Sequence, residues 1–361
     1  MSLVFISILV FVNIYLSRKV GWIFSLENIN FLYILFAFIP IFMMVGVIGF
    51  SNSLTGIGSL VYSIAAITMG VMLYFVLSML LVDLLNIFVK LKPIYFGISV
   101  LVVLVPVVAY GLWNATNNKL LKIEVQVEDL KEELKVMHFS DIHLGHFRGK
   151  DYLQRLVDKA KSQDTDFVVI TGDLFDGKIQ LKLETLEPLK DFAVPVYFVE
   201  GNHDKYSGVH QIKDYLRKTD VHVLENEIDT FKGIQLVGLN HMQADNDTPS
   251  VPPNPSDISI KSVLSELIID KDHPSILLHH SPDGIEHANL AGIDLYLCGH
   301  THAGQLFPVN YINDLLFKYN KGLHKYKDTR IYVSQGAGTF GPPMRLGTKS
   351  EITLINLVPV N

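Results

Sequence analysis

The 361-residue sequence has one cysteine, Cys298, which excludes an internal disulfide bond as a support for its fold. Residues 1–118 lack histidine and are nearly devoid of charge, which excludes imidazole chemistry there and argues against a water-exposed domain. Their charged side chains are Arg18, Lys19, Glu27, Asp83, Lys90 and Lys92. All 14 histidines and a net charge of −8 therefore belong to residues 119–361, since the first part carries +2 and the whole chain −6. We divide the chain at this change of composition into residues 1–115 and 116–361.

Long apolar runs fill the first part of the chain, at residues 2–17, 31–50, 57–82 and 94–113. At about 1.5 Å of rise per residue, the last three are long enough as helices to cross a hydrocarbon core of roughly 30 Å. We predict about four membrane-spanning helices, which makes the protein a multi-pass component of the cell membrane. The alternative is a cleaved signal peptide at the first run and three spans. It is disfavoured because Arg18 and Lys19 follow this run rather than precede it.

The cations between the apolar runs predict the orientation of the chain. Arg18 and Lys19 fall between the first two runs, and Lys90 and Lys92 fall between the last two. Short loops rich in cations stay in the cytoplasm, whereas the loop at residues 51–56 is uncharged. We therefore expect the second part of the chain on the extracytoplasmic side of the membrane.

Apolar and alternating segments in the second part predict a fold rich in strands. The expected strands are residues 121–128, 134–140, 167–171, 196–200, 234–239, 275–279 and 294–298. The spacing of apolar residues in 150–162 predicts a helix. Polar clusters follow directly after several of these strands, so their side chains are expected on loops held by a rigid sheet.

Five such clusters carry the side chains suited to metal binding or catalysis. They are Asp141-Ile-His143, Gly172-Asp173, Gly201-Asn202-His203-Asp204, His279-His280-Ser-Pro-Asp283 and Gly299-His300-Thr-His302. Each cluster alone is compatible with an ordinary turn or helix cap. A carboxylate such as that of Asp173 can bridge two cations about 3.5–4 Å apart, and the five clusters together indicate a site for two metal ions. Imidazole combined with carboxylate suits manganese, iron or zinc.

The order of these clusters resembles that of the calcineurin-like metallophosphoesterases, over about residues 135–357. Residues 299–305 (GHTHAGQ) and 335–357 are similar to the bacterial membrane-associated branch of that family, which includes YkuE-like and YaeI-like proteins. The apolar first part is similar to that of the transmembrane metallophosphoesterases. The resemblance implies an α/β fold, a four-layer αββα sandwich of two sheets flanked by helices, preceded by the transmembrane helices.

The resemblance also implies a role for each polar side chain. One divalent metal ion would be held by Asp141, His143, Asp173 and His302, and the second by Asp173, Asn202, His280 and His300. His203 would be the general acid or would stabilise the leaving oxygen, and Asp204 would orient its ring. The two cations would polarise the phosphoryl oxygens and produce the attacking hydroxide from a bridging water.

These features predict a membrane-anchored hydrolase that cleaves a phosphate ester or pyrophosphate bond. Attachment to the bilayer favours a phosphorylated substrate that is lipid-linked or belongs to the cell envelope. Nucleic acid is not expected as a partner, because the acidic second part offers no cationic groove for a phosphate backbone. Two alternatives stay open: a nucleotide or cyclic-nucleotide phosphodiesterase, and a sensor that binds a phosphorylated ligand and signals through the helices. The oligomeric state is unknown from the sequence.

Two further residues and two further segments are not assigned to the metal site. His279 directly precedes a predicted ligand and is expected to be structural, because adjacent side chains point in different directions. Arg345 could bind a substrate phosphate or form a surface ion pair. The apolar segment at residues 306–319 could rest on the bilayer, cover the site or pack in the core. Residues 248–257 are rich in proline and are expected to form a surface loop.

Overall fold

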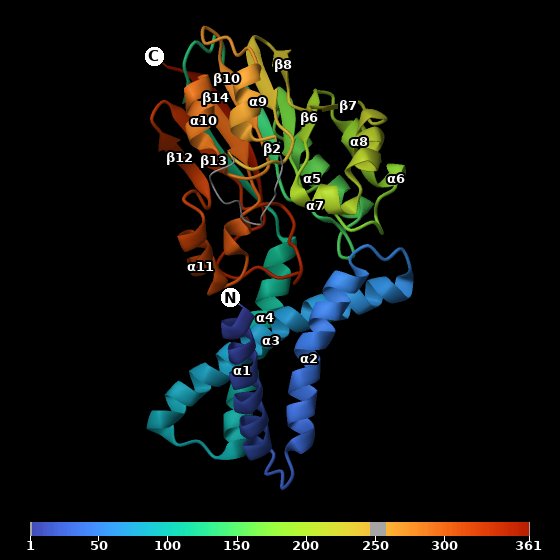
Figure 1. Ribbon diagram of the computed structural model, residues 1–361, viewed down its shortest axis with the longest axis vertical. Coiled ribbons are helices and arrows are strands. Elements are labelled where there is room, and N and C mark those ends of the chain that lie inside the picture. The colour runs from blue at the N-terminus through green and yellow to red at the C-terminus, as the bar shows by residue number, and fades with distance from the viewer. Residues whose placement is uncertain (1, 246–257, 361) are drawn as a thin grey trace. The chain divides into compact units, whose positions relative to one another are not determined.

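A computed structural model of the protein describes residues 2–245 and 258–360 (Figure 1). The expected proline-rich loop at residues 248–257 lies outside the described residues. The chain divides into two compact units. The helical unit comprises Met1–Trp113 and Gly341–Met344, and the sheet unit comprises Asn114–Phe340 and Arg345–Asn361.

The first part of the chain forms four long helices, α1 (Ser2–Ile23), α2 (Asn30–Phe50), α3 (Gly56–Val89) and α4 (Pro93–Thr116). Each is long and apolar enough to cross a membrane. Large apolar side chains point away from the unit, and those of Phe11, Ile48 and Phe88 are 72–80% exposed. Such a surface is suited to lipid and not to water. The four predicted helices are therefore confirmed, with α4 ending in residues that belong to the sheet unit.

α1 runs further than the sequence predicted. Arg18 and Lys19, expected in a loop, lie inside this helix, which ends at Ile23. The reason is a polar contact within the helical unit, in which Lys19 Nζ forms an ion pair with the carboxylate of Asp83 in α3. Tyr15 also donates its hydroxyl to Asp83 Oδ2 at 2.5 Å. The lysine charge is thus neutralised between helices and does not need a loop.

The sheet unit is built from strands that form two six-stranded sheets and one small two-stranded sheet. Its strands are β1 (Lys119–Val127), β2 (Leu134–Phe139), β3 (Leu144–Gly145), β4 (Phe167–Thr171), β5 (Phe175–Asp176), β6 (Val196–Val199), β7 (Val221–Val223), β8 (Glu227–Phe231), β9 (Ile234–Gly238), β10 (Ser275–Leu278), β11 (Leu295–Cys298), β12 (Gly322–Tyr326), β13 (Thr329–Val333) and β14 (Glu351–Pro359). The strand order is β1-β14-β2-β4-β6-β7 in the first large sheet and β12-β13-β11-β10-β9-β8 in the second. Strands β2, β4 and β6 are mutually parallel, as are β9, β10, β11 and β13.

Helices cover both outer faces of the paired sheets. The helices of the sheet unit are α5 (Lys150–Lys161), α6 (Leu183–Leu186), η1 (Glu187–Asp191), α7 (Asn202–Ser207), α8 (Val209–Arg217), α9 (Ile260–Glu266), α10 (Ile285–Ala291), η2 (His302–Gly304) and α11 (Val309–Leu316). Figure 1 shows α5 and α8 on one side of the sheets and α9 and α10 on the other. The predicted helix at 150–162 is confirmed as α5, which buries the apolar side that its spacing indicated.

The core has three apolar layers, which follow from the two-residue period of the strands. In β4, Val168 and Ile170 pack toward α5 and α8, whereas Phe167 and Val169 pack toward the second sheet. A third apolar layer joins the second sheet to α9 and α10. The observed fold is thus the predicted four-layer αββα sandwich, and all seven predicted strands are confirmed with small shifts at their ends.

Candidate metal centre

The five polar clusters follow the carboxyl ends of β2, β4, β6, β10 and β11. Because these strands are parallel to their neighbours, the loops after them meet at one edge of the sandwich. The backbone of this edge is strained: φ is between +48° and +72° at Asp141, His143, Asp173, His300 and His302. Side-chain-bearing residues rarely adopt that region, and such conformations concentrate at functional sites.

Glycines allow the loops to approach one another closely. Gly172 has φ of +80°, and a Cβ atom there would lie 2.6 Å from the backbone nitrogen of Gly201. A Cβ atom at Gly299 would lie 2.1 Å from Asp141 Oδ2. Both positions therefore require glycine.

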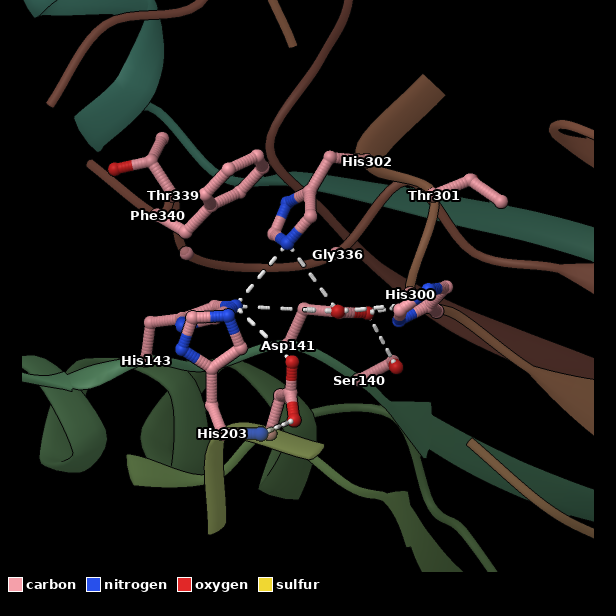
Figure 2. A network of polar contacts seen from close by, with 12 residues as sticks. Ser140, Asp141, His143, His203, His300, Thr301, His302, Gly336, Thr339 and Phe340 are labelled. Carbon is pink, nitrogen blue, oxygen red and sulfur yellow. Dashed lines mark hydrogen bonds and ion pairs between the residues drawn. The ribbon is translucent and has the colours of Figure 1, made fainter. Parts of the chain in front are cut away.

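Asp141, His143 and His302 form the first group of potential ligands, and all three are buried. The Nε2 atoms of His143 and His302 lie 3.1 Å apart, and His302 Nε2 lies 3.3 Å from Asp141 Oδ1. Figure 2 shows these three side chains converging on one point. Ligand atoms that each lie about 2.1 Å from one ion have this mutual separation.

Asp173, His280 and His300 form the second group. His280 Nε2 lies 3.1 Å from Asp173 Oδ2 and 3.2 Å from His300 Nδ1. The amide oxygen of Asn202 lines the same cavity, and it is buried without a hydrogen-bond partner among the described residues. A buried acceptor of this kind is costly unless something electropositive pairs with it, which is what a metal ion would do.

Asp173 connects the two groups. Its Oδ2 lies 3.1 Å from His280 Nε2 and 3.7 Å from His143 Nε2, so one oxygen faces both. Its other oxygen accepts the backbone N–H of His203 at 2.8 Å, which fixes the carboxylate plane. The structure therefore brings six of the predicted ligands together in two groups that Asp173 connects, and the seventh, Asn202, lines the cavity over them.

The ionisation of these residues fits two divalent cations. Burial lowers the pKa of His143 to about 3, so its ring is neutral and offers a lone pair. Burial opposes the charge on Asp173, but His280 and His203 outweigh it and hold the pKa of that carboxyl well below its usual range. Burial opposes the imidazolium form of His280, but Asp173 raises the pKa of His280 to about 10, so a metal ion at Nε2 would displace a proton from that atom. His280 donates its Nδ1 proton to the carbonyl oxygen of Thr171 at 2.8 Å, which directs Nε2 at the centre. The donor set of carboxylate and imidazole suits transition-metal ions.

Arg345 is fully buried behind His302, and neither predicted role for it is correct. Its guanidinium donates to the carbonyl oxygens of Gln335 at 2.5 Å and Gly338 at 2.8 Å, and lies 3.0 Å from His302 Nδ1. These contacts leave it neither on the surface nor free to bind a phosphate. Burial, assisted by the adjacent guanidinium, lowers the pKa of His302 and keeps its ring neutral.

His203 is held by Asp176 and not by the predicted Asp204. His203 Nδ1 lies 2.9 Å from Asp176 Oδ1. Asp204 instead accepts the backbone N–H groups of Gly201 and Phe175, both at 3.0 Å, as the third residue of α7. A side chain at that position folds back over the helix start, which carries it away from the adjacent imidazole. Burial opposes the imidazolium form of His203, but Asp173 and Asp176 raise its pKa to about 9.

Sequence reasoning missed two residues of the site, although each carried a signal. Asp176 lies three positions after Asp173, and pairing of β5 with β3 places it beside His143. His241 follows β9, as the predicted ligands follow their strands, and its ring centroid is 5.6 Å from that of His280. The adjacent His279 is structural as expected, since its ring lies 2.9 Å from both Tyr296 Oη and the Ser281 carbonyl oxygen.

A cavity of about 430 Å³ opens over the two groups. Its polar floor contains Asp173, Asn202, His203, His300 and His302, and its walls include Tyr206, Val309, Phe317 and Phe340. The ring of Phe340 lies over the site, 5.0 Å from that of His302 between centroids. Figure 2 shows these two rings side by side. The cavity thus has charged and polar side chains at its floor and apolar side chains along its walls.

Comparison with known proteins agrees with this geometry. Residues 134–304 match the family model described as calcineurin-like phosphoesterase. A metallophosphoesterase of Campylobacter jejuni is 33% identical over 267 residues, 73% of this chain and 69% of that protein. A transmembrane protein with metallophosphoesterase domain of Danio rerio is 34% identical over 274 residues, which are 71% of this chain and 61% of the Danio rerio protein. Phosphodiesterase YaeI of Escherichia coli is 27% identical over 249 residues, which are 64% of this chain and 84% of YaeI.

The chain belongs to the calcineurin-like metallophosphoesterases, a family of metal-dependent hydrolases that cleave phosphate esters. It spans 65% of the length of two Helicobacter pylori relatives. The predicted similarities to YaeI and to the transmembrane metallophosphoesterases are both confirmed.

Proposed function

We propose that the protein is a membrane-anchored phosphoesterase that hydrolyses a phosphate ester or pyrophosphate bond at a two-metal centre. The observation that carries this proposal is the single oxygen of Asp173 that faces both His143 and His280. The proposed ligands are Asp141, His143, Asp173, Asn202, His280, His300 and His302. Two divalent ions, of manganese, iron or zinc, would neutralise the phosphoryl oxygens and acidify the attacking water.

His203 is the proposed general acid. Its Nδ1 is engaged by Asp176, which leaves Nε2 for a substrate in the cavity that His203 lines. A pKa of about 9 keeps the ring protonated at neutral pH, so it can give a proton to the leaving oxygen as the phosphorus–oxygen bond breaks. Asp176 holds the ring in place and favours its charged form.

The proposed substrate is a lipid-linked or cell-envelope phosphate. Three observations support it: four helices suited to a membrane, the apolar walls of the cavity, and the acidic charge of the second part of the chain, which repels nucleic acid. The cations near the helix ends support an extracytoplasmic location of the sheet unit. YaeI, a relative named as a phosphodiesterase, supports ester hydrolysis as the reaction.

The test is a substrate screen on the full-length protein in detergent with added manganese. The substrates are a phosphatidic acid, an isoprenoid pyrophosphate, a nucleotide, a cyclic nucleotide and a bis-aryl phosphate. We expect hydrolysis that needs metal and favours a lipid substrate, and it should be lost in His203→Ala but not in His273→Ala, an exposed histidine paired with Asp270. Preference for nucleotides would support the phosphodiesterase alternative, and fully metal-loaded protein without any hydrolysis would support the sensor.

A further inference from the structure

α11 exposes an apolar surface that the fold leaves uncovered. Tyr311, Ile312, Leu315 and Leu316 are 56–87% exposed, and the helix has no buried residue. By contrast, α5 and α8 each turn an apolar side into the core. The core-packing interpretation of residues 306–319 is therefore excluded for α11. A contiguous exposed patch of large apolar side chains, continued by Phe307, marks an interaction surface.

Hydrogen bonds within the sheet unit tie the start of α11 to the end of α4. Phe307 donates its backbone N–H to the carbonyl oxygen of Leu346 at 2.8 Å. On the other side of the same short segment, the side chain of Asn114 donates to the carbonyl oxygens of Arg345 at 3.1 Å and Thr348 at 3.0 Å. Asn114 lies in the last turn of α4, which is suited to span the membrane. The segment at residues 345–348 therefore links the start of α11, within the sheet unit, to the residues that end the last apolar helix.

The charge after α11 is opposite in sign to that of the rest of the sheet unit. Lys318, Lys321, Lys325 and Lys327 are exposed, whereas the same stretch contains only Asp314 and Asp328 as acids, so residues 306–328 have a net charge of +2. Residues 119–361 as a whole carry −8. An apolar helix followed by lysines complements a bilayer that contains anionic lipids, with the side chains in the acyl region and the ammonium groups among the headgroups.

The opposite side of α11 faces the reaction centre. Val309, Asn313 and Phe317 line the cavity over the metal ligands, and the ring centroid of Phe317 lies 5.9 Å from that of His300. Residues 309, 313 and 317 are spaced at four-residue intervals, so their side chains lie on one face of α11 and its C-terminal end. Tyr311 and Leu315 lie on the opposite face of the helix. One helix is thus both a wall of the cavity and the exposed apolar surface.

We propose that α11 and Phe307 insert into an anionic bilayer as an interfacial element, and that a phosphorylated lipid enters the cavity along α11 without leaving the membrane. The acyl part of that lipid stays in the bilayer while its phosphate reaches the centre. The entry of substrate rests on the proposed function above, whereas the insertion of α11 does not.

Insertion is tested with the full-length protein reconstituted in vesicles of phosphatidylcholine and phosphatidylglycerol. Leu315→Cys is labelled with an environment-sensitive fluorophore, and the control is Leu290→Cys on α10, the same residue type at 72% exposure. The native Cys298 is buried and does not compete for label. We expect acyl-chain nitroxide lipids to quench the label at 315 at least threefold more than the label at 290.

Equal quenching at the two positions would overturn insertion. The same conclusion would follow if the label at 315 escaped lipid quenching while Leu315→Cys formed disulfide-linked dimers, because α11 would then face a second copy of the chain.

Substrate entry is tested with Leu315→Asp combined with Leu316→Asp, against Leu290→Asp. We expect the α11 variant to lose at least tenfold in kcat/KM for a phosphorylated lipid in vesicles, and to stay within twofold on a water-soluble aryl phosphate. The control should change neither rate. Equal losses on both substrates, or a wild-type protein that cleaves the aryl ester but not the lipid, would overturn entry along α11. Whether α11 inserts into the bilayer would still be decided by the quenching experiment, which does not depend on enzyme activity.

Discussion

Asp176 Oδ1 lies 2.9 Å from the Nδ1 atom of His203, and this contact favours the protonated form of the His203 ring. The carboxylate and the neighbouring Asp173 outweigh the effect of burial and raise the pKa of His203 to about 9. The imidazolium form is therefore complete at neutral pH and is lost as the pH rises through that value. A general acid with this pKa requires the activity to fall on the alkaline side.

The first prediction is that Asp176→Asn moves the alkaline limb of the pH–kcat profile to lower pH. Asparagine keeps the size of the side chain but removes its charge, so the pKa of His203 should fall by about one unit. The measurement is kcat against pH on an alkyl phosphate ester, whose leaving oxygen needs a proton. Asp214→Asn, at an exposed position in α8, is the control and should not move the limb. An unchanged limb in Asp176→Asn would remove His203 from the role of acid.

The second prediction separates proton transfer from metal binding. His203→Ala should retain its metal, because His203 is not among the proposed ligands, while kcat on an alkyl ester drops by roughly 10²–10⁴. An aryl ester has a leaving group that needs little protonation and should lose far less. Metal content and the two rates are measured on the same preparation. Losses of equal size on the two esters would contradict the assignment.

The third prediction concerns the carboxylate that the two groups share. Asp173→Asn should lower the occupancy of both ions, because Asp173 Oδ2 faces His143 and His280 alike. Asp141→Asn should mainly affect the ion of the first group, where Asp141 lies close to His302. Elemental analysis of the full-length protein measures both. An Asp173→Asn protein that loses only one ion would show that this residue does not bridge.

The strand-end clusters were predictable because they depend on local signals. An apolar strand followed by Asp-x-His or Gly-His-x-His is visible in the sequence, and parallel strands bring such ends to one edge. The partner of His203 was not predictable in the same way. Asp204 is adjacent in sequence, whereas Asp176 reaches the ring through the pairing of β3 with β5, which are only two residues long each. Arg345 likewise contacts His302, from which it is separated by 43 positions in the sequence, and no local sequence pattern predicts that Arg345 is buried.

The fourth prediction addresses the polar contact inside the helical unit. Asp83→Ala leaves Lys19 without its carboxylate partner in an apolar environment, so thermal unfolding in detergent should occur at a lower temperature, with a loss of up to about 3 kcal/mol. Replacing both residues, as Lys19→Met with Asp83→Leu, should recover most of that loss because no unpaired charge remains. Lys92→Ala, a cation in the loop before α4, is the control. A double variant as unstable as Asp83→Ala would show that the pair does not act as a unit.

The last prediction is the side of the membrane on which the sheet unit lies, because this decides which substrates reach the centre. Lys90 and Lys92 lie between α3 and α4, while the connection between α2 and α3 has no charge, and from this difference we expect the sheet unit outside the cytoplasm. Leu54→Cys, in the uncharged connection, and Leu290→Cys, in the sheet unit, should react with a membrane-impermeant thiol reagent in intact cells. Leu26→Cys, between α1 and α2, should react only after lysis. All three leucines are exposed in the structure, so accessibility within the fold does not limit the reaction. The reverse pattern would put the sheet unit in the cytoplasm and shift the expected substrates toward nucleotides and lipids of the inner leaflet.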